Sequence, residues 1–301
     1  MRIFYLLLLA LLYPMCALTQ VTDYLDNIRA NGKTTATPEY LWTQTRVAEL
    51  AKQLQPYAAD TITDVSDEAY YIVFMAGYIS KKTEDRQTAV SFLAEGLNSS
   101  STRIVSNNIT RLQHFTKADI DAKAKQVIEE RLDKWNSMYY MRVAKMAAQL
   151  GVGRNQIRDR QMLEKGADVE TKWALHLAMA RLGEQTDIDF ITRRAYSIPY
   201  DYAEDLIRTI IPELIYTRQK QAIDVCVGIL QDDDCKCASG NPDVDAKILC
   251  GYRIMELLAP VIKGYPYKSS ASGMIDASNY EEALSVVRKW FADNTEYEII
   301  E

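Results

Sequence analysis

The chain has 301 residues, of which 48% are hydrophobic, so it can bury one large core or a succession of small ones. Its 41 acidic residues outnumber its 35 basic ones, for a formal net charge of −6, and this balance argues against nucleic acid as a partner because phosphate binding needs a concentrated basic surface. Only 12 glycines and 8 prolines are present, too few for the many tight turns of a β-sandwich or barrel, so helix is the expected element.

Residues 1–19 have the pattern of a secretory signal peptide. Arg2 supplies a positive start, residues 3–12 form an unbroken apolar run, and small residues precede Gln20. The run is too short for a membrane span, which needs about 20 residues, and no later segment is long and apolar enough to be transmembrane. We expect cleavage before Gln20 and an exported protein, periplasmic or extracellular. Lipoprotein anchoring at Cys16 is the less favoured alternative, because the residues before it match the bacterial lipobox poorly.

Apolar residues at three-to-four-residue spacing, bounded by capping or turn residues, predict a succession of short helices with no convincing strand between them. The links between them are short, except for residues 231–241. The predicted helices are residues 38–54, 67–79, 85–97, 101–115, 119–132, 137–150, 155–165, 168–182, 186–196, 200–216, 219–230 and 242–262.

These helices fall into two interleaved series that share one period of about 31–36 residues. The last interval is longer because a loop that carries cysteines lies inside it. Such a period predicts stacked helix pairs, that is, an all-α fold in the form of a right-handed α-solenoid of about six pairs. The second helices of the pairs start near residues 67, 101, 137, 168, 200 and 242, and the first helices start near residues 85, 119, 155, 186 and 219.

One predicted helix is apolar nearly all round. Residues 171–184 read "TKWALHLAMARLGE", with polar positions confined to narrow gaps, as expected for an inner helix that touches its partner and both neighbouring repeats. The segment resembles the second helix of a HEAT-like repeat of the short bacterial type. In that repeat a basic residue and an aromatic precede a small-residue run that ends in arginine, leucine, glycine and an acid. The matching positions are Lys172, Trp173, Ala174, Ala178, Met179, Arg181, Leu182, Gly183 and Glu184.

A second segment, residues 141–151, is similar but has Gln149 in place of the arginine. Elsewhere the resemblance is one of size and period only. It implies an α-solenoid over residues 20–264 with a concave face lined by second helices. It implies no reaction, because such repeats serve as interaction surfaces in many unrelated systems. Residues 265–301 are expected to form a loop, a capping amphipathic helix over residues 280–294 and an acidic tail.

Four cysteines of the expected mature chain lie close together in the sequence: Cys226, Cys235, Cys237 and Cys250. In an exported chain they predict two disulfides in preference to a zinc site, because their spacing matches no usual zinc pattern. Joining Cys235 to Cys237 would close a very small ring, which favours pairing each loop cysteine with a helix cysteine. However, Cys226 and Cys250 are expected at similar depth in an antiparallel helix pair, which favours joining those two.

The cysteine loop is also acidic. Carboxylates and loop carbonyls could hold calcium, but the spacing does not match an EF-hand. We interpret the loop as a solvated link whose acids flank helix ends, and we predict neither a metal nor a cofactor. The acids concerned are Asp232, Asp233, Asp234, Asp243 and Asp245.

No motif in the sequence specifies a reaction. The two histidines, His114 and His176, are more than one repeat apart, and no nucleophile or metal motif occurs. We therefore predict a non-enzymatic scaffold of the cell envelope that binds a protein, or alternatively a glycan, on its concave face. The candidate contact residues are the polar positions that interrupt second helices, namely Asn107, Arg111, Arg142, Lys145, Lys172, His176 and Arg208.

Two further observations bear on function. Tyrosines near the starts of second helices, such as Tyr70 and Tyr71, suit a recognition patch because they bring large, stiff contact area with a polar tip. The alternative function is a glycan-active envelope enzyme, which would need two carboxyl groups converging in the concave groove. The acids that could serve are Glu95, Glu129, Glu130, Glu204 and Asp205.

Overall fold

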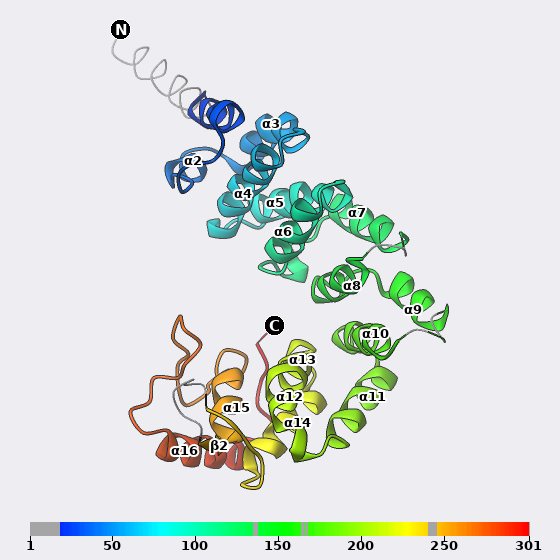
Figure 1. The fold of residues 1–301 in the computed structure, drawn as a ribbon, viewed down its shortest axis with the longest axis vertical. Coiled ribbons are helices and arrows are strands. Elements are labelled where there is room, and N and C mark those ends of the chain that lie inside the picture. The colour runs from blue at the N-terminus through cyan, green and yellow to red at the C-terminus, as the bar shows by residue number, and fades with distance from the viewer. Residues whose placement is uncertain (1–18, 135–137, 164–165, 167, 240–245, 301) are drawn as a thin grey trace. The chain divides into compact units, whose positions relative to one another are not determined.

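The structure, a computed structural model, describes residues 19–134, 138–163, 166, 168–239 and 246–300. This part of the chain is mainly helical, as predicted (Figure 1). It divides into two compact units, Met1–Gln156 and Ile157–Glu301, and we describe each by itself. Residues 1–18, which hold nearly all of the predicted signal peptide, lie outside the described residues. Among the described helices, none combines the length and the apolar character that crossing a membrane requires.

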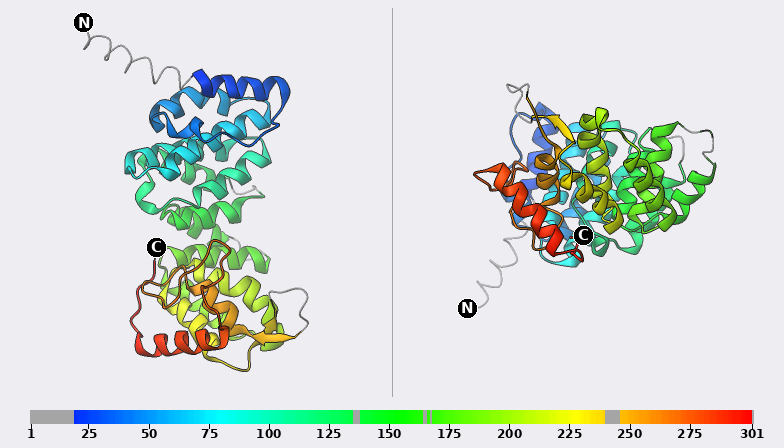
Figure 2. Two further views of the ribbon diagram at one scale, coloured as in Figure 1. Left: turned by 90° about the vertical axis from the view of Figure 1, so that its left-hand side faces the viewer. Right: turned by 90° about the horizontal axis from the view of Figure 1, so that it is seen from below.

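Unit 1 is built from helices that pack against their neighbours in the chain. Helix α4 contacts α3, α5 and α6, and α5 contacts α7. Figure 1 shows α4, α6 and α8 along one side of the unit and α3, α5 and α7 along the other, and Figure 2 shows the unit as successive layers of helices. The helices are residues 19–31, α2 (Tyr40–Thr43), α3 (Val47–Ala58), α4 (Thr63–Ile79), α5 (Thr83–Glu95), the 3-10 turn η1 (Gly96–Asn98), α6 (Thr102–Leu112), the 3-10 turn η2 (Lys117–Asp119), α7 (Ala122–Leu132) and α8 (Tyr140–Gln149).

The helix over residues 19–31 is absent from the sequence prediction. Val21, Leu25 and Ile28 lie on one face at helical spacing, and all three are buried. The helix ends before Gly32, whose φ of 76° is a left-handed conformation that glycine adopts without strain. The signal was therefore present, but it adjoins the apolar run assigned to the signal peptide.

The predicted helix over residues 38–54 is wrong in its bounds, because the chain forms two helices there, α2 and α3. Between them Arg46 is extended, with ψ of 137°. The preceding residues 43–45 are polar and partly β-branched, and such residues favour turns over helix interiors. The break lets Trp42 pack edge-on against Tyr71 of α4, with 5.8 Å between ring centroids.

Successive helix pairs in unit 1 are joined by polar bonds as well as by apolar packing. The Arg86 side chain of α5 donates two hydrogen bonds, each 2.7 Å long, to the two carboxylate oxygens of Asp119 in η2. Asp119 also accepts from Thr116 in a capping box. Burial acts to raise the pKa of Asp119, but the Arg86 guanidinium and the Thr116 hydrogen bonds outweigh it and hold that pKa below its ordinary value.

Unit 2 has helices, one π-helical turn and a short hairpin around a buried apolar core. Helix α10 contacts α11, and helices α13 and α15 both contact α14. Helices α11 and α14 also contact each other. Helix α9 (Arg154–Leu163) begins at the boundary of the units. The remaining elements are α10 (Val169–Arg181), α11 (Gln185–Tyr196), the 3-10 turn η3 (Tyr200–Tyr202), α12 (Ala203–Asp205), the π-helix η4 (Leu206–Ile210), α13 (Ile211–Tyr216), α14 (Lys220–Gln231), β1 (Lys236–Ala238), β2 (Lys247–Leu249), α15 (Cys250–Leu258) and α16 (Tyr280–Asp293).

The two segments that the sequence analysis matched to each other end in the same local structure. In α10 the N–H of Glu184 bonds to the carbonyl of Met179, and Gly183 has φ of 86°. In α8 the N–H of Val152 bonds to the carbonyl of Ala147, and Gly151 has φ of 74°. Both are Schellman motifs, in which a left-handed glycine lets the chain satisfy the last helical carbonyls.

Helix α10 is buried on most sides but not all round. Ala174, Leu177 and Met179 are buried, whereas Trp173 is half-buried. The Trp173 indole N–H donates to Glu213 of α13 at 2.5 Å, so this side chain connects two second helices at their edge.

The predicted helix over residues 200–216 contains a π-helical turn, η4, followed directly by α13. Pro212 has no backbone N–H, and its ring would clash with the carbonyl of residue 208 in a regular α-helix. Widening the helix by one residue accommodates the proline, and Leu206 and Ile211 stay buried.

The predicted helix over residues 242–262 begins too early. Residues 236–238 and 247–249 form an antiparallel hairpin, in which Cys237 lies opposite Ile248, and α15 begins only at Cys250. This strand pair corrects the expectation that no strand occurs. The Cys250 N–H donates to the Cys235 carbonyl at 2.9 Å, which fixes the point where the hairpin passes into the helix.

Helix α16 covers α14 and α15 with a face of Ala283, Leu284, Val287 and Phe291, in agreement with the predicted apolar face. The acidic segment after it returns to the unit. Its backbone pairs with residues 261–263 through the Ile262↔Ile299 bridge.

We expect Asp119→Asn to lower the free energy of unfolding of unit 1 by about 2–4 kcal/mol, because it leaves Arg86 with a neutral partner in a largely buried pair. The folded-state pKa of Asp119 is lowered, so its stabilising contribution is present above its unfolded value of 3.8 and is lost as the pH falls through the folded value. Urea unfolding at pH 7, 5, 4 and 3 should therefore show a difference between the two proteins that is constant above about pH 5 and shrinks below pH 4.

Asp23→Asn is the matched control, because Asp23 is exposed and forms no ion pair within the described residues. A difference for Asp119→Asn that is as small as that of the control, or that grows toward low pH, would contradict this assignment.

Candidate functional site

Some of the candidate contact residues of unit 1 bind side chains of a neighbouring second helix. Asn107 and Arg111 on α6 both bind Asp67 of α4, the amide at 2.9 Å and the guanidinium at 2.8 Å. The Arg111 guanidinium also lies over the ring of Tyr71, 5.7 Å from its centroid. Only 11% of the Arg111 side chain is exposed, so this residue has a positioning role between helices.

Arg142 on α8 is the most accessible of the unit 1 candidates. Its guanidinium donates to the Ser106 hydroxyl at 2.7 Å and contacts Thr110 at 3.3 Å, yet the residue is exposed. A guanidinium has five N–H donors, so Arg142 keeps capacity for a ligand. Lys145, one helical turn further on, is half-buried.

A row of aromatic side chains runs along α4 to a residue just after the end of α6. The sequence analysis did not predict this row. We call Tyr71, Phe74, Tyr78 and His114 the aromatic row. Neighbouring ring centroids are 6.4 Å apart for Tyr71 and Phe74, 5.5 Å for Phe74 and Tyr78, and 5.4 Å for Tyr78 and His114. The signal in the sequence was the spacing of the three α4 residues at i, i+3 and i+7, which places them on one helix face.

The aromatic row is buried at Phe74, half-buried at Tyr71 and exposed at its other end. Phe74 is buried, whereas Tyr78 is 46% exposed and the adjacent Ile79 is 49% exposed. His114 is also exposed. The exposed end is therefore an apolar and aromatic patch on α4 and at the end of α6, of the kind that marks an interaction surface.

The other end of the row is held by a buried carboxylate. Glu68 is 3% exposed and accepts hydrogen bonds from Tyr24, Thr37 and Lys33. The Lys33 ammonium also lies 5.8 Å from the centroid of the Tyr71 ring. A paired, hydrogen-bonded carboxylate of this kind positions its neighbours, and here it fixes the edge of the row.

The two adjacent tyrosines expected to contribute to recognition have different surroundings. Tyr70 is 6% exposed and packs on Phe92, and burial together with the charge of Glu95 raises its pKa to about 12. Tyr71 is half-buried within the aromatic row. Only Tyr71 therefore has a face available near the surface.

In unit 2 the three candidate residues lie in different settings. Lys172 is exposed on α10, and Arg208 is exposed on η4, where it pairs with Glu204 at 2.6 Å. His176 instead lies at the contact of three helices. It stacks on Phe190 of α11 at 3.8 Å, and its Nδ1 is 2.6 Å from a carboxylate oxygen of Asp187.

Asp187 is the centre of this buried network. It is 1% exposed and also binds Gln161 at 2.7 Å and Arg158 at 2.9 Å, both from α9. Burial acts to raise the pKa of Asp187, but the hydrogen bonds from His176 and Gln161 and the charge of Arg158 hold it below its ordinary value. The network joins α9, α10 and α11, so His176 is a packed residue rather than part of an open contact face.

The acids considered for glycan hydrolysis are mostly paired. Glu95 lines a cavity of about 750 Å³ in unit 1 that also contains Asp60 and several serine and threonine side chains. Glu95 pairs with Lys123 at 2.5 Å, and Asp60 pairs with Arg29 at 2.6 Å. A general acid must hold a proton at the working pH, whereas hydrogen bonds from the Ile62 N–H and the Arg29 guanidinium outweigh burial and hold the pKa of Asp60 below its ordinary value.

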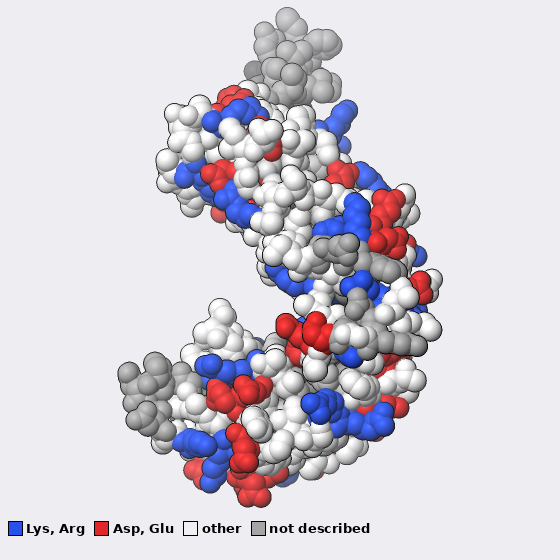
Figure 3. Space-filling model, turned by 45° about the vertical axis from the view of Figure 1, so that its right-hand side comes forward, with Lys and Arg blue, Asp and Glu red and all other residues white. Residues whose placement is uncertain are grey.

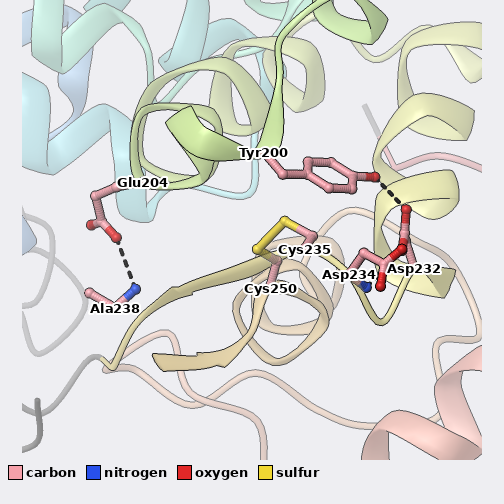
Figure 4. Close-up of a disulfide and its surroundings, with 7 residues drawn as sticks. All are labelled: Tyr200, Glu204, Asp232, Asp234, Cys235, Ala238 and Cys250. Carbon is pink, nitrogen blue, oxygen red and sulfur yellow. Dashed lines mark hydrogen bonds between the residues drawn. A yellow bond between two sulfur atoms is a disulfide. The ribbon is translucent and has the colours of Figure 1, made fainter. Parts of the chain in front are cut away.

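The structure contains one disulfide, Cys235–Cys250, where the sequence predicted two (Figure 4). It joins a loop cysteine to a helix cysteine, which is the type of pairing that the sequence analysis favoured on ring size. Cys226 and Cys237 are buried free thiols. Cys226 bonds through its sulfur to the Ala222 carbonyl inside α14, while Cys237 lies in the hairpin, and burial raises the pKa of both thiols.

The acidic loop is tied to unit 2 by hydrogen bonds. In Figure 4 the Tyr200 hydroxyl donates a hydrogen bond to the Asp232 carboxylate, at 2.6 Å. The Ala238 N–H donates a hydrogen bond to the Glu204 carboxylate. Asp243 and Asp245, two of the acids considered for calcium, lie outside the described residues. Within the described part, no group of three or more possible ligands is placed to hold a metal ion.

Charges of both signs are mixed over the surface. Figure 3 shows lysine and arginine side chains interspersed with aspartate and glutamate on the face in view, with uncharged residues between them. No protein-family model matches the chain, and no curated protein matches it. The resemblance to a HEAT-like repeat therefore rests on the quoted residues.

We expect replacement of Cys235 and Cys250 by alanine to lower the free energy of unfolding by about 2–4 kcal/mol. The disulfide closes a loop of 15 residues, and without it the unfolded chain gains conformational entropy that folding must remove. Mass spectrometry of the alkylated, non-reduced protein should show these two cysteines joined and Cys226 and Cys237 free once the protein is denatured. Cys226→Ala is the control for core packing. Two disulfides, or a bond involving Cys226, would contradict the observed pairing.

Proposed function

We propose that the protein is a non-enzymatic binding scaffold, an α-solenoid of helix pairs that holds a protein partner on the second-helix face of unit 1. The observation that carries the proposal is the exposed end of the aromatic row, where the rings of Tyr78 and His114 are in contact and Ile79, next to Tyr78 in the sequence, is also exposed. Arg142 on α8 adds an exposed cation on the same set of helices. Exposed aromatics and arginine are the residue types that dominate the energy of protein interfaces.

The solenoid part of the proposal is supported by contacts between residues one repeat apart. In unit 1, Gln149 donates to the carbonyl of Gln113, 36 residues earlier, and Arg142 bonds to Ser106 at the same separation. In unit 2, Arg181 donates to the carbonyl of Tyr216, 35 residues later. Contacts at a sequence separation of about one repeat are what stacked repeats produce.

Export is part of the same proposal. It is supported by the apolar run near the start of the sequence and by the disulfide, since disulfides persist in oxidising compartments. A protein is favoured over a glycan as partner because the exposed end of the aromatic row carries the apolar Tyr78 and Ile79 side chains. A glycan-active enzyme is the alternative, and the paired state of Glu95 and Asp60 weighs against it.

The test places a photo-crosslinking amino acid at position 78 of the full-length protein and, as a matched control, at Gln126, which is exposed on the first helix α7. Crosslinking in envelope extracts should give a discrete product from position 78 and none from position 126. Unlabelled wild-type protein should compete for the product. A variant with Tyr78→Ala and His114→Ala should compete at least tenfold less well, because truncated interface aromatics cost about 2 kcal/mol or more.

Circular dichroism must show that the competing variant is folded. Equal crosslinking from positions 78 and 126, or full competition by the variant, would remove the second-helix face as the binding surface.

A further inference from the structure

A second cavity lies wholly within unit 2, on the side of its first helices. It has a volume of about 420 Å³, which is within the range of small-ligand pockets. It is lined by the last turns of α11 and α14, the link between α11 and η3, and the start of the acidic loop. The residues that matter for its chemistry are Tyr196, Tyr200, Leu206, Gly228 and Asp232.

The cavity is open because α14 has a glycine where it passes the pocket. A Cβ atom placed on Gly228 would meet no heavy atom closer than the Tyr196 hydroxyl oxygen, at 3.8 Å. A side chain is therefore sterically admissible at this position and would occupy the cavity. Glycine in a helix interior is less stabilising than alanine, so the glycine that leaves this space open lowers the stability of α14.

Several features give the pocket a negative character. Asp232 provides a carboxylate, and hydrogen bonds from the Tyr200 hydroxyl and the Asp234 N–H hold its pKa below the ordinary value. Helix α11 ends at Tyr196 and α14 ends at Gln231, so the negative ends of two helix dipoles face the same cavity.

The Asp232 carboxylate has no ion-pair partner of its own among the described residues, although the charge of Arg288 helps to hold its pKa down. Arg288 is a basic residue beside the acidic loop. It forms an ion pair with Asp233 at 2.8 Å and donates a hydrogen bond to the carbonyl of Leu230. Among the residues that the structure describes, no lysine or arginine forms an ion pair with Asp232. The pocket therefore contains a negative charge that no described lysine or arginine pairs with directly.

The walls of the pocket are aromatic and apolar. Tyr196 is 65% exposed and Tyr200 is 37% exposed, and both line the cavity together with Ile198 and Leu206. Tyrosine faces attract ammonium and guanidinium groups, and the apolar wall suits the aliphatic chain that carries such a group. The Tyr200 ring is held in place by its bond to Asp232, next to the disulfide that anchors the loop (Figure 4).

We propose that this tyrosine–aspartate pocket binds an aliphatic cation, the lysine or arginine side chain of a polypeptide. The cation lies beside the Asp232 carboxylate and against the faces of the tyrosine rings, and its aliphatic chain contacts Ile198 and Leu206. The inference is independent of the second-helix face proposed above, since no residue is shared between the two sites. A free aliphatic amine has the same chemistry as a lysine side chain, and the experiment separates the two sources.

The test follows backbone amide signals of the isotope-labelled full-length protein by NMR during titration. The probes are n-butylammonium, n-butylguanidinium, neutral n-butanol, and the blocked tripeptide Gly-Lys-Gly with Gly-norleucine-Gly as its uncharged counterpart. Both cations and the lysine peptide should shift the amides of Gly228, Ile229 and Asp232 in a saturable way, and the two neutral probes should not. The lysine peptide should bind at least threefold more tightly than n-butylammonium.

Two variants and one matched control locate the site. Asp232→Asn should weaken binding of the lysine peptide at least fivefold, and Gly228→Leu should abolish it by filling the cavity. Asp233→Asn removes the same charge one residue away and should leave binding within twofold of wild type. The dispersion of the amide spectrum shows whether each variant is folded.

Equal loss in Asp232→Asn and Asp233→Asn would show general electrostatic attraction and would overturn the proposed pocket. Shifts of the pocket amides with n-butanol would overturn the cation specificity. Tighter binding of n-butylammonium than of the peptide would overturn the polypeptide as the source of the cation.

Discussion

The structure depends on one constraint: the described helices have apolar surface that is buried against neighbouring helices of the chain. Helices such as α10 have apolar residues on several faces, and each face needs a neighbour from the chain before or after it. In unit 2 the amphipathic helix α16 packs its apolar face against α14 and α15. Polar side chains also join neighbouring helices. The Arg86–Asp119 and Trp173–Glu213 bonds fix the relative positions of the helices that they connect.

This constraint explains how far the sequence could be interpreted. Apolar periodicity located most helices, because burial against neighbours selects for it, and glycines such as Gly151 and Gly183 marked helix ends. The hairpin before Cys250 was missed because its strands are three residues long and carry no alternation that can be distinguished from a helix start. The disulfide partners could not be derived, since they depend on where that hairpin brings Cys235.

The candidate contact residues show why the site was harder to predict than the fold. A polar residue that interrupts an apolar helix either faces solvent or bonds to the next helix, and spacing alone does not distinguish these cases. Arg111 and His176 proved to join helices, whereas Arg142 and Lys172 are exposed. The spacing of its α4 residues made the aromatic row predictable from the sequence, but its link to His114, which follows α6, could be seen only in the packed structure.

The surface features with functional potential occur where the packing constraint is relaxed. At the end of α4 the aromatic row passes from buried Phe74 to exposed Tyr78. At the end of α14 a glycine stands where a larger residue could have filled the space beside Tyr196. Stability alone would favour filling that space, because empty volume in a packed region forfeits contacts. An unfilled pocket with a fixed charge is therefore better explained by a ligand than by packing.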